Sequence, residues 1–289
     1  MGGQKVDEIR PSISTGVFQE LSPEEEIRRL VGIGWRYLEI NFSIGRFGRC
    51  EAYRIKRLCE DLGVSVLQVH GCNPGMARES PEERRKFVDQ AKTSLLWAGE
   101  LGAEWVVLHP SNRKAGRRTP DAFEEVKERN LEGFRELLET AHSANVGIAV
   151  ENLPPLLHDS MEGERLFGTE PSELVWLVEN AGPERMGVCL DVNHIFAKCQ
   201  GFNQYQAIRW FGRPLVATHI SDNDGFREQH LLPFMGDIAW RTVMKGLREV
   251  GYKGLFNLEV DLNKTPLSVR DDLLRYALRL TEEMIQGDI

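Results

Sequence analysis

Two kinds of periodic segment alternate along this chain. Short, nearly continuous apolar runs are typical of parallel strands that are buried on both faces. These runs occupy residues 9–15, 37–42, 64–70, 104–109, 147–152, 187–193, 216–221 and 255–260. Longer amphipathic stretches lie between the runs. The pattern therefore predicts eight strands that alternate with helices.

Helix start signals support this alternation. Ser22-Pro23 and Ser80-Pro81 each precede a pair of glutamates, which is typical of an N-cap followed by a first helical turn. A long amphipathic stretch covers about residues 121–144, and other helices are expected to begin near residues 170, 238 and 266. Glycines just before several strands are typical helix ends.

Eight strand-helix units predict an α/β protein with the (β/α)8 TIM-barrel fold. An open, doubly wound sheet is the alternative. It is disfavoured because no glycine-rich fingerprint follows the first strand. Since no linker or low-complexity stretch divides the sequence, we expect a single domain over residues 1–289.

Polar residues interrupt the apolar runs at their downstream ends. Active sites of such barrels lie at these strand ends. The residues are His70, His109, Glu151, Asp191, His194, His219 and Glu259, and Glu228 and His230 follow in a loop. A single histidine or acid at such a position is usually a hydrogen-bonded structural residue. Six strand ends that carry imidazoles or carboxylates together favour a divalent metal site instead.

The candidate ligands fall into three sets. Glu151, Asp191, His219 and Glu259 come from four adjacent strands and form the expected core. His70 and His109 are expected to hold a second ion that shares Glu151. The third set is His194, Glu228 and His230. Each outer set is alternatively a site for substrate hydroxyls. The donor types suit Zn²⁺ or Mn²⁺, with one to three ions.

Other side chains beside these ends have two readings each. One group either binds substrate hydroxyls or a phosphate, or else caps turns and supports the ligands. Its members are Asn152, Asn193, Ser221, Asp222 and Arg227. Glu39 points inward and either binds substrate or balances a buried arginine. A wall for a sugar, or core packing, is expected of Trp105, Trp210, Phe211 and Trp240. A basic loop, either solvated or facing a phosphate, consists of Lys114, Arg117 and Arg118.

Composition adds limits on partners and compartment. The formal charge is −8, which disfavours nucleic acid as the main partner, although a local basic rim is compatible with it. The five cysteines are odd in number and form no CxxC pair, as expected in a reducing compartment. The first residues have no apolar signal region and no run reaches membrane-spanning length, so we expect a cytoplasmic protein without membrane contact.

The motifs around the candidate ligands resemble a known superfamily. They are Leu-His109-Pro, Val-Glu151-Asn, Cys-Leu-Asp191-Val-Asn-His194, Thr-His219-Ile-Ser-Asp and Glu228-Gln-His230. In this order they resemble the xylose isomerase-like TIM-barrel superfamily, which joins sugar isomerases and epimerases to endonuclease IV-type enzymes. The resemblance implies the fold, a divalent metal and metal-bridging glutamates. Each of the nine ligand positions of the three-zinc endonucleases has a match, with Glu228 in place of an aspartate, but the loops at residues 71–75 and 231–238 depart from the expected motifs.

The leading expectation is a metal-dependent isomerase or epimerase of a small sugar or related polyhydroxy compound. Glu151 and Glu259 would transfer the α-proton through a metal-stabilised enediolate. The alternative is an endonuclease IV-like zinc hydrolase that acts at abasic DNA sites. A third reading is a catalytically silent barrel that binds a metabolite. Superfamily members are often dimers or tetramers, which leaves a homo-oligomer open.

Overall fold

The computed structural model describes residues 8–42, 52–112, 120–155 and 166–287. Within these ranges the strands are β1 (Arg10–Ser14), β2 (Tyr37–Asn41), β3 (Ser65–His70), β4 (Trp105–Leu108), β5 (Gly147–Glu151), β6 (Met186–Asp191), β7 (Leu215–His219) and β8 (Leu255–Leu258). The helices are α1 (Pro23–Ile33), α2 (Ala52–Leu62), α3 (Pro81–Leu101), α4 (Pro120–Ala144), α5 (Pro171–Ala181), α6 (Gln204–Phe211), α7 (Trp240–Glu249) and α8 (Leu267–Gln286). Lys114, Arg117 and Arg118 lie outside the described residues.

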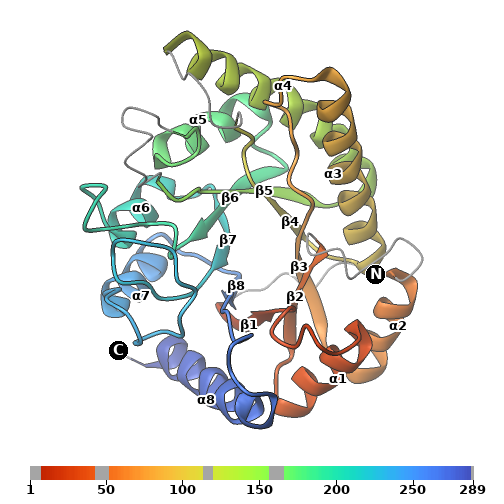
Figure 1. Cartoon of the computed structure of the whole chain (residues 1–289), viewed down its shortest axis with the longest axis vertical. Helices are drawn as coiled ribbons and strands as arrows, with labels where there is room; N and C mark the ends of the chain where they lie inside the picture. Colours follow the sequence, from red (N-terminus) through yellow and green to blue (C-terminus); the bar gives the residue numbers. More distant parts are fainter. Residues whose placement is uncertain (1–7, 43–51, 113–119, 156–165, 288–289) are drawn as a thin grey trace.

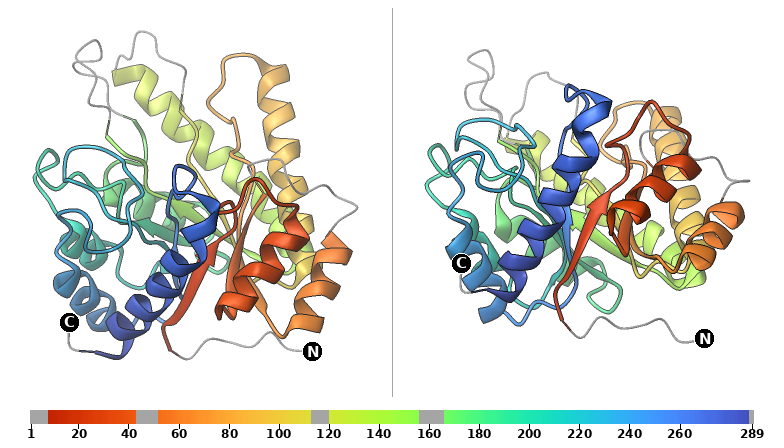
Figure 2. Two further views of the ribbon diagram at one scale, coloured as in Figure 1. Left: turned by 60° about the horizontal axis from the view of Figure 1, so that its bottom comes forward. Right: turned by 90° about the horizontal axis from the view of Figure 1, so that it is seen from below.

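The strands form one parallel sheet that closes into a barrel, which confirms the predicted TIM-barrel fold (Figure 1). Neighbours follow the order β7-β6-β5-β4-β3-β2-β1-β8. The ring closes between β7 and β8, where the backbone nitrogen of Ile220 donates to Asn257 at 2.8 Å and that of Glu259 donates to Ile220 at 3.0 Å. The helices pack around the outside of the strands (Figure 2).

Local sequence explains where the helices begin. Ser22 caps α1 through a reciprocal capping box with Glu25, and Pro23 occupies the first turn. Ser80 accepts a hydrogen bond from the backbone nitrogen of Glu83 at the start of α3. Such caps satisfy backbone donors that the helix itself leaves unpaired. The caps therefore determine the residues at which α1 and α3 begin.

The inside of the barrel is polar on one side and apolar on the other. Buried polar residues face inward from β1, β2, β3 and β8, namely Ser12, Ser14, Glu39, Gln68 and Asn257. A separate apolar group comes from β4 to β7 and consists of Val107, Ala149, Cys189 and Ala217. The interior of such barrels is usually filled by branched apolar side chains. The polar half is therefore a departure that calls for a physical explanation.

Two further features bear on the expectations from sequence. None of the helices in the described ranges has both the length and the apolar character needed to cross a bilayer. Cys59, Cys72, Cys189 and Cys199 are free thiols, and Cys50 lies outside the described residues.

Candidate metal centre

The nine candidate ligands meet at the carboxyl ends of the strands. The central set combines Glu151 of β5, Asp191 of β6, His219 of β7 and Glu259 just after β8, whose ligand atoms lie within 4.8 Å of one another. His219 Nδ1 is 3.2 Å from Glu151 Oε1 and 3.2 Å from Glu259 Oε2. Four strand ends thus aim their side chains at one point.

A second set shares Glu151. His70 of β3 places Nε2 3.6 Å from Glu151 Oε2, and His109 after β4 places Nε2 3.0 Å from the same oxygen. The two imidazole rings meet edge to face with centroids 5.3 Å apart. One carboxylate therefore faces the central set with Oε1 and the two histidines with Oε2.

The third set lies at the solvent side. His230 Nε2 is 2.8 Å from Glu228 Oε1, and His194 Nε2 is 3.6 Å from the same oxygen. The ligand atoms of the three side chains lie within 4.8 Å of one another. The structure therefore brings together every residue that the sequence nominated as a ligand.

The outer ring nitrogens of three histidines are fixed by backbone carbonyls. His70 Nδ1 lies 3.2 Å from the carbonyl oxygen of Gly71. His194 Nδ1 lies 2.8 Å from that of Asn152, and His230 Nδ1 lies 3.0 Å from that of Glu259. Because a carbonyl oxygen only accepts, Nδ1 carries the proton and Nε2 is left for a ligand role. His219 has the opposite arrangement, with Nε2 2.9 Å from Glu39 Oε2 and Nδ1 directed at the central set.

Unpaired atoms show that the central set fits a cation. Asp191 Oδ2 and His219 Nδ1 are buried and have no hydrogen-bond partner in the described part of the chain. Buried polar atoms almost always have partners, and an orphan calls for an unseen water or ion. A mixed imidazole and carboxylate set of this kind suits Zn²⁺, Mn²⁺, Fe²⁺ or Co²⁺. The donors present therefore match the ion type expected from the sequence.

The clustered charges shift several pKa values. Burial by itself raises the pKa of Glu151, but the imidazoles of His219 and His109 outweigh it and hold that pKa well below its ordinary value. Burial raises the pKa of both Asp191 and Glu259.

The pKa values of two histidines rise, although burial by itself lowers them. Burial lowers the pKa of His194, but Asp191 and Glu228 raise it to about 10, and Glu228 and Asp191 likewise raise that of His230 to about 9. Without a cation, these imidazoles carry protons at neutral pH, so binding a cation displaces protons.

Most of the neighbouring polar side chains support the fold of the site. Asn152 exchanges two hydrogen bonds with the backbone of Asp191, at 2.8 and 3.0 Å. Asn193 accepts from the backbone of Gln229, which holds the loop that carries Glu228.

The next turn is held in the same way. Asp222 accepts from Trp240 Nε1 at 2.8 Å and from the backbone nitrogens of Asn223 and Ile238. Ser221 Oγ lies 3.4 Å from His230 Nδ1. Arg227 is exposed and pairs with Asp224 at 2.9 Å. These contacts follow the supporting-role reading for Asn152, Asn193, Ser221 and Asp222.

The aromatic residues nominated as a sugar wall lie elsewhere. Trp105 is the first residue of β4, so it lies at the opposite end of the strand from His109, and its ring packs against Gly147. Phe211 and Trp240 are buried in the core, and Trp210 lies on α6 with its ring against Phe202. Packing thus explains the positions of Trp105, Phe211 and Trp240, whereas Trp210 is 53% exposed on the outside of the barrel.

Two supporting residues were not nominated from the sequence. Asn73 contacts His109 twice. Its Oδ1 accepts from the backbone nitrogen of His109 at 3.3 Å, and its Nδ2 lies 3.3 Å from His109 Nδ1. Gln68 bonds to Glu39 beneath the cluster. An amide inside a β-rich run, two residues before His70, is the one signal in the sequence that marks Gln68 as inward-facing.

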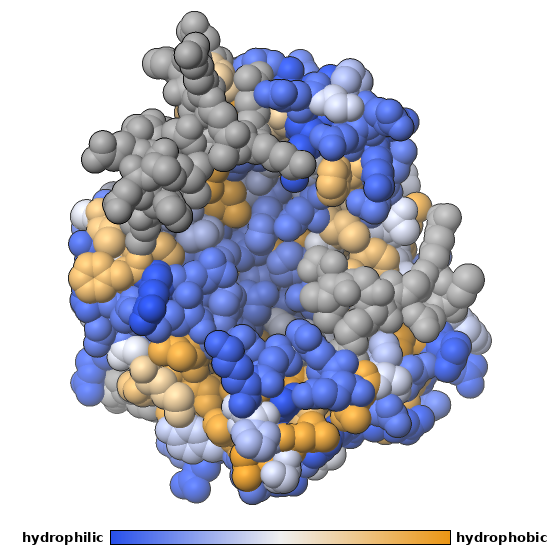
Figure 3. All heavy atoms as spheres, viewed as in Figure 1, coloured by the Kyte–Doolittle hydropathy of each residue, from blue (hydrophilic) through white to orange (hydrophobic). Residues whose placement is uncertain are grey.

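The cluster lies at the accessible mouth of the barrel. Figure 3, viewed as Figure 1, shows hydrophilic residues around a hollow at the centre of this face. The side-chain exposure falls from 42% at Glu228 to 20% at Glu259 and 1% at Glu151. A small polar molecule would therefore reach Glu228 first and Glu151 last.

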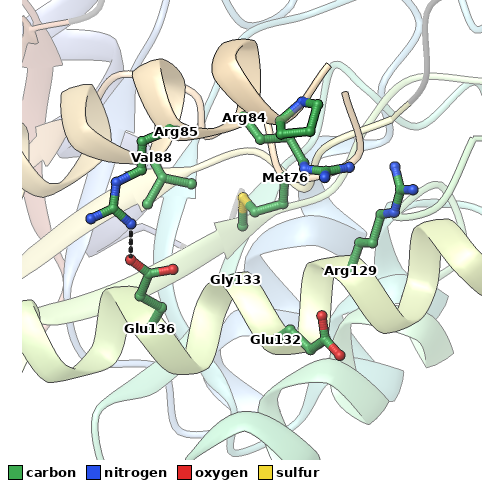
Figure 4. Close-up of a pocket in the computed structure, with 9 residues that line it drawn as sticks. Met76, Arg84, Arg85, Val88, Arg129, Glu132, Gly133 and Glu136 are labelled. Atoms are coloured by element: carbon green, nitrogen blue, oxygen red, sulfur yellow. Dashed lines mark hydrogen bonds and ion pairs between the residues drawn. The ribbon is translucent and has the colours of Figure 1, made fainter. Parts of the chain in front are cut away.

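A second hollow of about 380 Å³ lies between α3 and α4, away from the cluster (Figure 4). Its arginines and Glu136 are engaged with each other or with the backbone. Arg85 pairs with Glu136 at 3.2 Å, and Arg84 and Arg129 both donate to the carbonyl oxygen of Arg78, at 3.0 and 3.2 Å. This hollow is a seam between two helices, and the chemistry is concentrated at the barrel mouth.

Comparison with known proteins agrees with this geometry. Residues 27–283 match the family described as Xylose isomerase-like TIM barrel. A fructoselysine 3-epimerase of Escherichia coli O157:H7 is 23% identical over 237 residues, which cover 80% of this chain and 82% of that protein. A probable endonuclease 4 of Sulfurihydrogenibium sp. (strain YO3AOP1) is 26% identical over 145 residues, which cover 50% and 48% of the two chains.

A solved structure shares the fold over nearly the whole length. The crystal structure of a D-tagatose 3-epimerase-like protein superimposes with a TM-score of 0.77 at 19% identity, and covers 96% of this chain and 98% of that one. The chain belongs to the xylose isomerase-like TIM barrel family.

Proposed function

We propose that this protein is a divalent-metal-dependent isomerase or epimerase of a sugar or related polyhydroxy compound. One observation carries the proposal. Two glutamates from separate strands, Glu151 and Glu259, both lie 3.2 Å from His219 Nδ1 in a set that also contains Asp191. A cation site flanked by two carboxylates provides a charge for an oxygen and two groups that transfer protons.

Glu151, Asp191, His219 and Glu259 would hold the ion. A bound divalent cation supplies positive charge that stabilises the negative oxygen formed when a carbon acid loses its proton. Glu151 and Glu259 remove and return the proton on the carbon next to the carbonyl. Because they approach from β5 and β8, one takes the proton and the other delivers it. Return of the proton to the opposite face of the same carbon gives epimerisation, and return to the neighbouring carbon gives isomerisation.

The relatives support this class of reaction. The fructoselysine 3-epimerase matches over four-fifths of this chain, and a 3-epimerase inverts one carbon of a sugar derivative. The metal requirement and the proton transfer are inferred here from the ligand set and from Asp191 Oδ2 and His219 Nδ1, for which the described part of the chain offers no hydrogen-bond partner.

Glu151→Gln and Glu259→Gln test the proposal. Each substitution keeps the shape of the side chain and removes the basic carboxylate. We expect kcat to fall by at least about 10²–10⁴-fold in each case. The measurement is turnover of a panel of ketoses and ketose derivatives with Mn²⁺ or Zn²⁺, together with incorporation of solvent deuterium at the reacting carbon.

Glu249→Gln is the matched control. Glu249 lies on α7, far from the cluster. Its carboxylate accepts hydrogen bonds from Tyr205 and Arg209 of α6. We expect it to keep the activity and deuterium incorporation of the unchanged protein. Full activity in either site variant, or product without solvent deuterium, contradicts the proton-transfer assignment.

A second candidate function is favoured by the two outer ligand sets. His70 and His109 share Glu151, and His194, Glu228 and His230 form a further set, so the cluster offers positions for three ions. Several ions held together suit hydrolysis of a phosphodiester, as in an endonuclease IV-like enzyme acting at abasic DNA sites. The probable endonuclease 4 relative supports this candidate, and the net charge of −8 weighs against it.

Metal counting and one substrate separate the two candidates. Cleavage of a duplex that contains an abasic site, lost on chelation, together with three zinc ions per chain would favour the nuclease. One ion per chain and conversion of a ketose without DNA cleavage would favour the isomerase or epimerase.

A further inference from the structure

A buried polar network lies directly beneath the candidate metal centre. Glu39 on β2 is fully buried, and each of its carboxylate oxygens is hydrogen-bonded. Oε1 accepts from Ser14 Oγ at 2.6 Å, and Oε2 accepts from Gln68 Nε2 at 2.5 Å and from His219 Nε2 at 2.9 Å. Glu39 thus joins three strands to the one histidine of the central set.

Strand register explains how these residues meet. Ser14 pairs with Glu39 across β1 and β2, and Glu39 pairs with Gln68 across β2 and β3. The β2–β3 pairing shifts by one position between Leu38 and Glu39. A bulge of this kind redirects a side chain, and such bulges are common beside active sites.

The contact gives His219 an orientation that the other clustered histidines do not have. His70, His194 and His230 donate Nδ1–H to neutral carbonyls and present Nε2. His219 donates Nε2–H to a carboxylate and presents Nδ1, which is buried and makes no hydrogen bond within the described residues. A carboxylate fixes the tautomer and also makes the imidazole a stronger donor to a cation.

We propose that Glu39 is a positioning residue that holds His219 with its proton on Nε2, so that Nδ1 is the atom that binds the cation. This inference rests on the proposed metal centre. Since Glu39 is fully buried beneath His219, it acts through that histidine and does not touch the substrate.

The sequence left open whether Glu39 binds substrate or balances a buried arginine. The structure assigns neither partner. Its described contacts are Ser14, Gln68 and His219, and the buried Arg270 pairs instead with Glu20. A buried carboxylate that lacks a partner of opposite charge is costly, so its retention is best explained by the imidazole that it orients.

Zn²⁺ binding tests the inference. In Glu39→Leu the acceptor for Nε2–H is lost, and we expect the affinity of the central set for Zn²⁺ to fall about 10–100-fold. In Glu39→Gln an amide oxygen still accepts from Nε2–H, so the loss is smaller. Affinity is measured by titration against a competing chelator, on protein whose fold is verified by circular dichroism.

Nitrogen-15 NMR of the histidine rings adds a readout specific to this site. In the unchanged protein we expect His219 to keep its proton on Nε2, and its Nδ1 resonance to shift on addition of Zn²⁺. Ser12→Ala is the control, because the side chain of Ser12 donates to Asn257 and not to Glu39 or His219. We expect that variant to bind Zn²⁺ with unchanged affinity.

Each outcome decides a different question. Equal Zn²⁺ affinity in Glu39→Leu, or a zinc-bound protein in which His219 carries its proton on Nδ1, overturns the role of Glu39. Failure of the unchanged protein to bind Zn²⁺ overturns the metal centre itself, and the role of Glu39 with it. If Glu39→Leu does not fold, the ring spectrum of the unchanged protein still gives the decision.

Discussion

At the scale of single residues, the outermost imidazoles are held by negative charge. His194 Nδ1 lies 3.3 Å from Asp191 Oδ2, and its Nε2 lies 3.6 Å from Glu228 Oε1. His230 Nε2 lies 2.8 Å from the same Glu228 oxygen. These carboxylates raise the pKa of His194 to about 10 and that of His230 to about 9, above the value of about 6.5 for an unfolded histidine. The protonated rings therefore stabilise the cation-free protein.

This shift predicts opposite pH trends for folding and for metal binding. The stabilisation is complete below pH of about 6.5 and is lost as pH rises toward 9–10, so the unfolding free energy of the chelated protein falls over that window. Zn²⁺ binds neutral imidazole, so its affinity rises with pH. Urea unfolding of chelated protein and zinc titrations at several pH values measure both trends.

Replacement of both histidines by glutamine is the control for this prediction. The double variant should show a flatter dependence of unfolding free energy on pH between 6.5 and 9.5. If it keeps the slope of the unchanged protein, other groups cause the trend.

Residue types and positions in the sequence were enough to nominate the cluster but not to assign every role. Asp191 and Asp222 both follow apolar runs in adjacent units. Asp222 is engaged by Trp240 Nε1 and by two backbone nitrogens, whereas Asp191 Oδ2 faces the His194 imidazole and accepts no hydrogen bond from the described residues. That difference depends on where Trp240 packs, which no local pattern in the sequence specifies.

At the scale of elements, the loop after β7 is held by Asp222. Asp222 links this loop to the start of α7, and the same loop carries Glu228 and His230. Gly236 packs so tightly here that a Cβ atom would lie 2.4 Å from the carbonyl oxygen of Asn223. The third ligand set therefore depends on a loop of fixed shape.

Asp222→Ala tests that dependence. The substitution leaves Trp240 Nε1 and the backbone nitrogen of Ile238 buried without their acceptor. We expect a loss of about 2–4 kcal/mol in unfolding free energy, because each unsatisfied buried donor costs about 1–3 kcal/mol. Chemical denaturation measures the change.

Asp237→Ala is the matched variant on the same loop. Asp237 is 58% exposed and its partner is Lys198 on the surface. We expect a change within about 0.5 kcal/mol. Equal losses in the two variants would show that Asp222 has no special role in holding the loop.

The positions of the strands were predictable because each strand is buried on both faces and bounded by clear turn and capping residues. Six helices were also indicated by their start signals or periodicity. The helices α2 and α6 were not singled out, although Asn203 and Gln206 form a capping box at the start of α6. The register shift at Leu38 and Glu39 depends on pairing with β3, a long-range contact that periodicity does not encode.

At the scale of the whole molecule, the ligand sets connect most of the barrel. The side chains come from the ends of β3 through β8 and from the loop after β7. Cations bound at the central and second sets would therefore join elements from residue 70 to residue 259 of the chain. Cation binding and global folding are expected to be strongly linked.

Removal of metal should lower the thermal stability of the entire protein. At a free ion concentration 100 times the dissociation constant, binding adds about 2.7 kcal/mol, which corresponds to a rise of about 4–5 °C in Tm. Differential scanning calorimetry after chelation and after re-addition of Zn²⁺ or Mn²⁺ measures this shift. An unchanged Tm at saturating ion would contradict the linkage.

The order of the ligands along the chain also has a consequence for protein synthesis. The central set spans Glu151 to Glu259, and Glu259 follows the last strand of the barrel. A nascent chain on the ribosome lacks this glutamate until all eight strands of the barrel have been made. The complete ion-binding set therefore forms only after the amino-terminal strands have already left the exit tunnel.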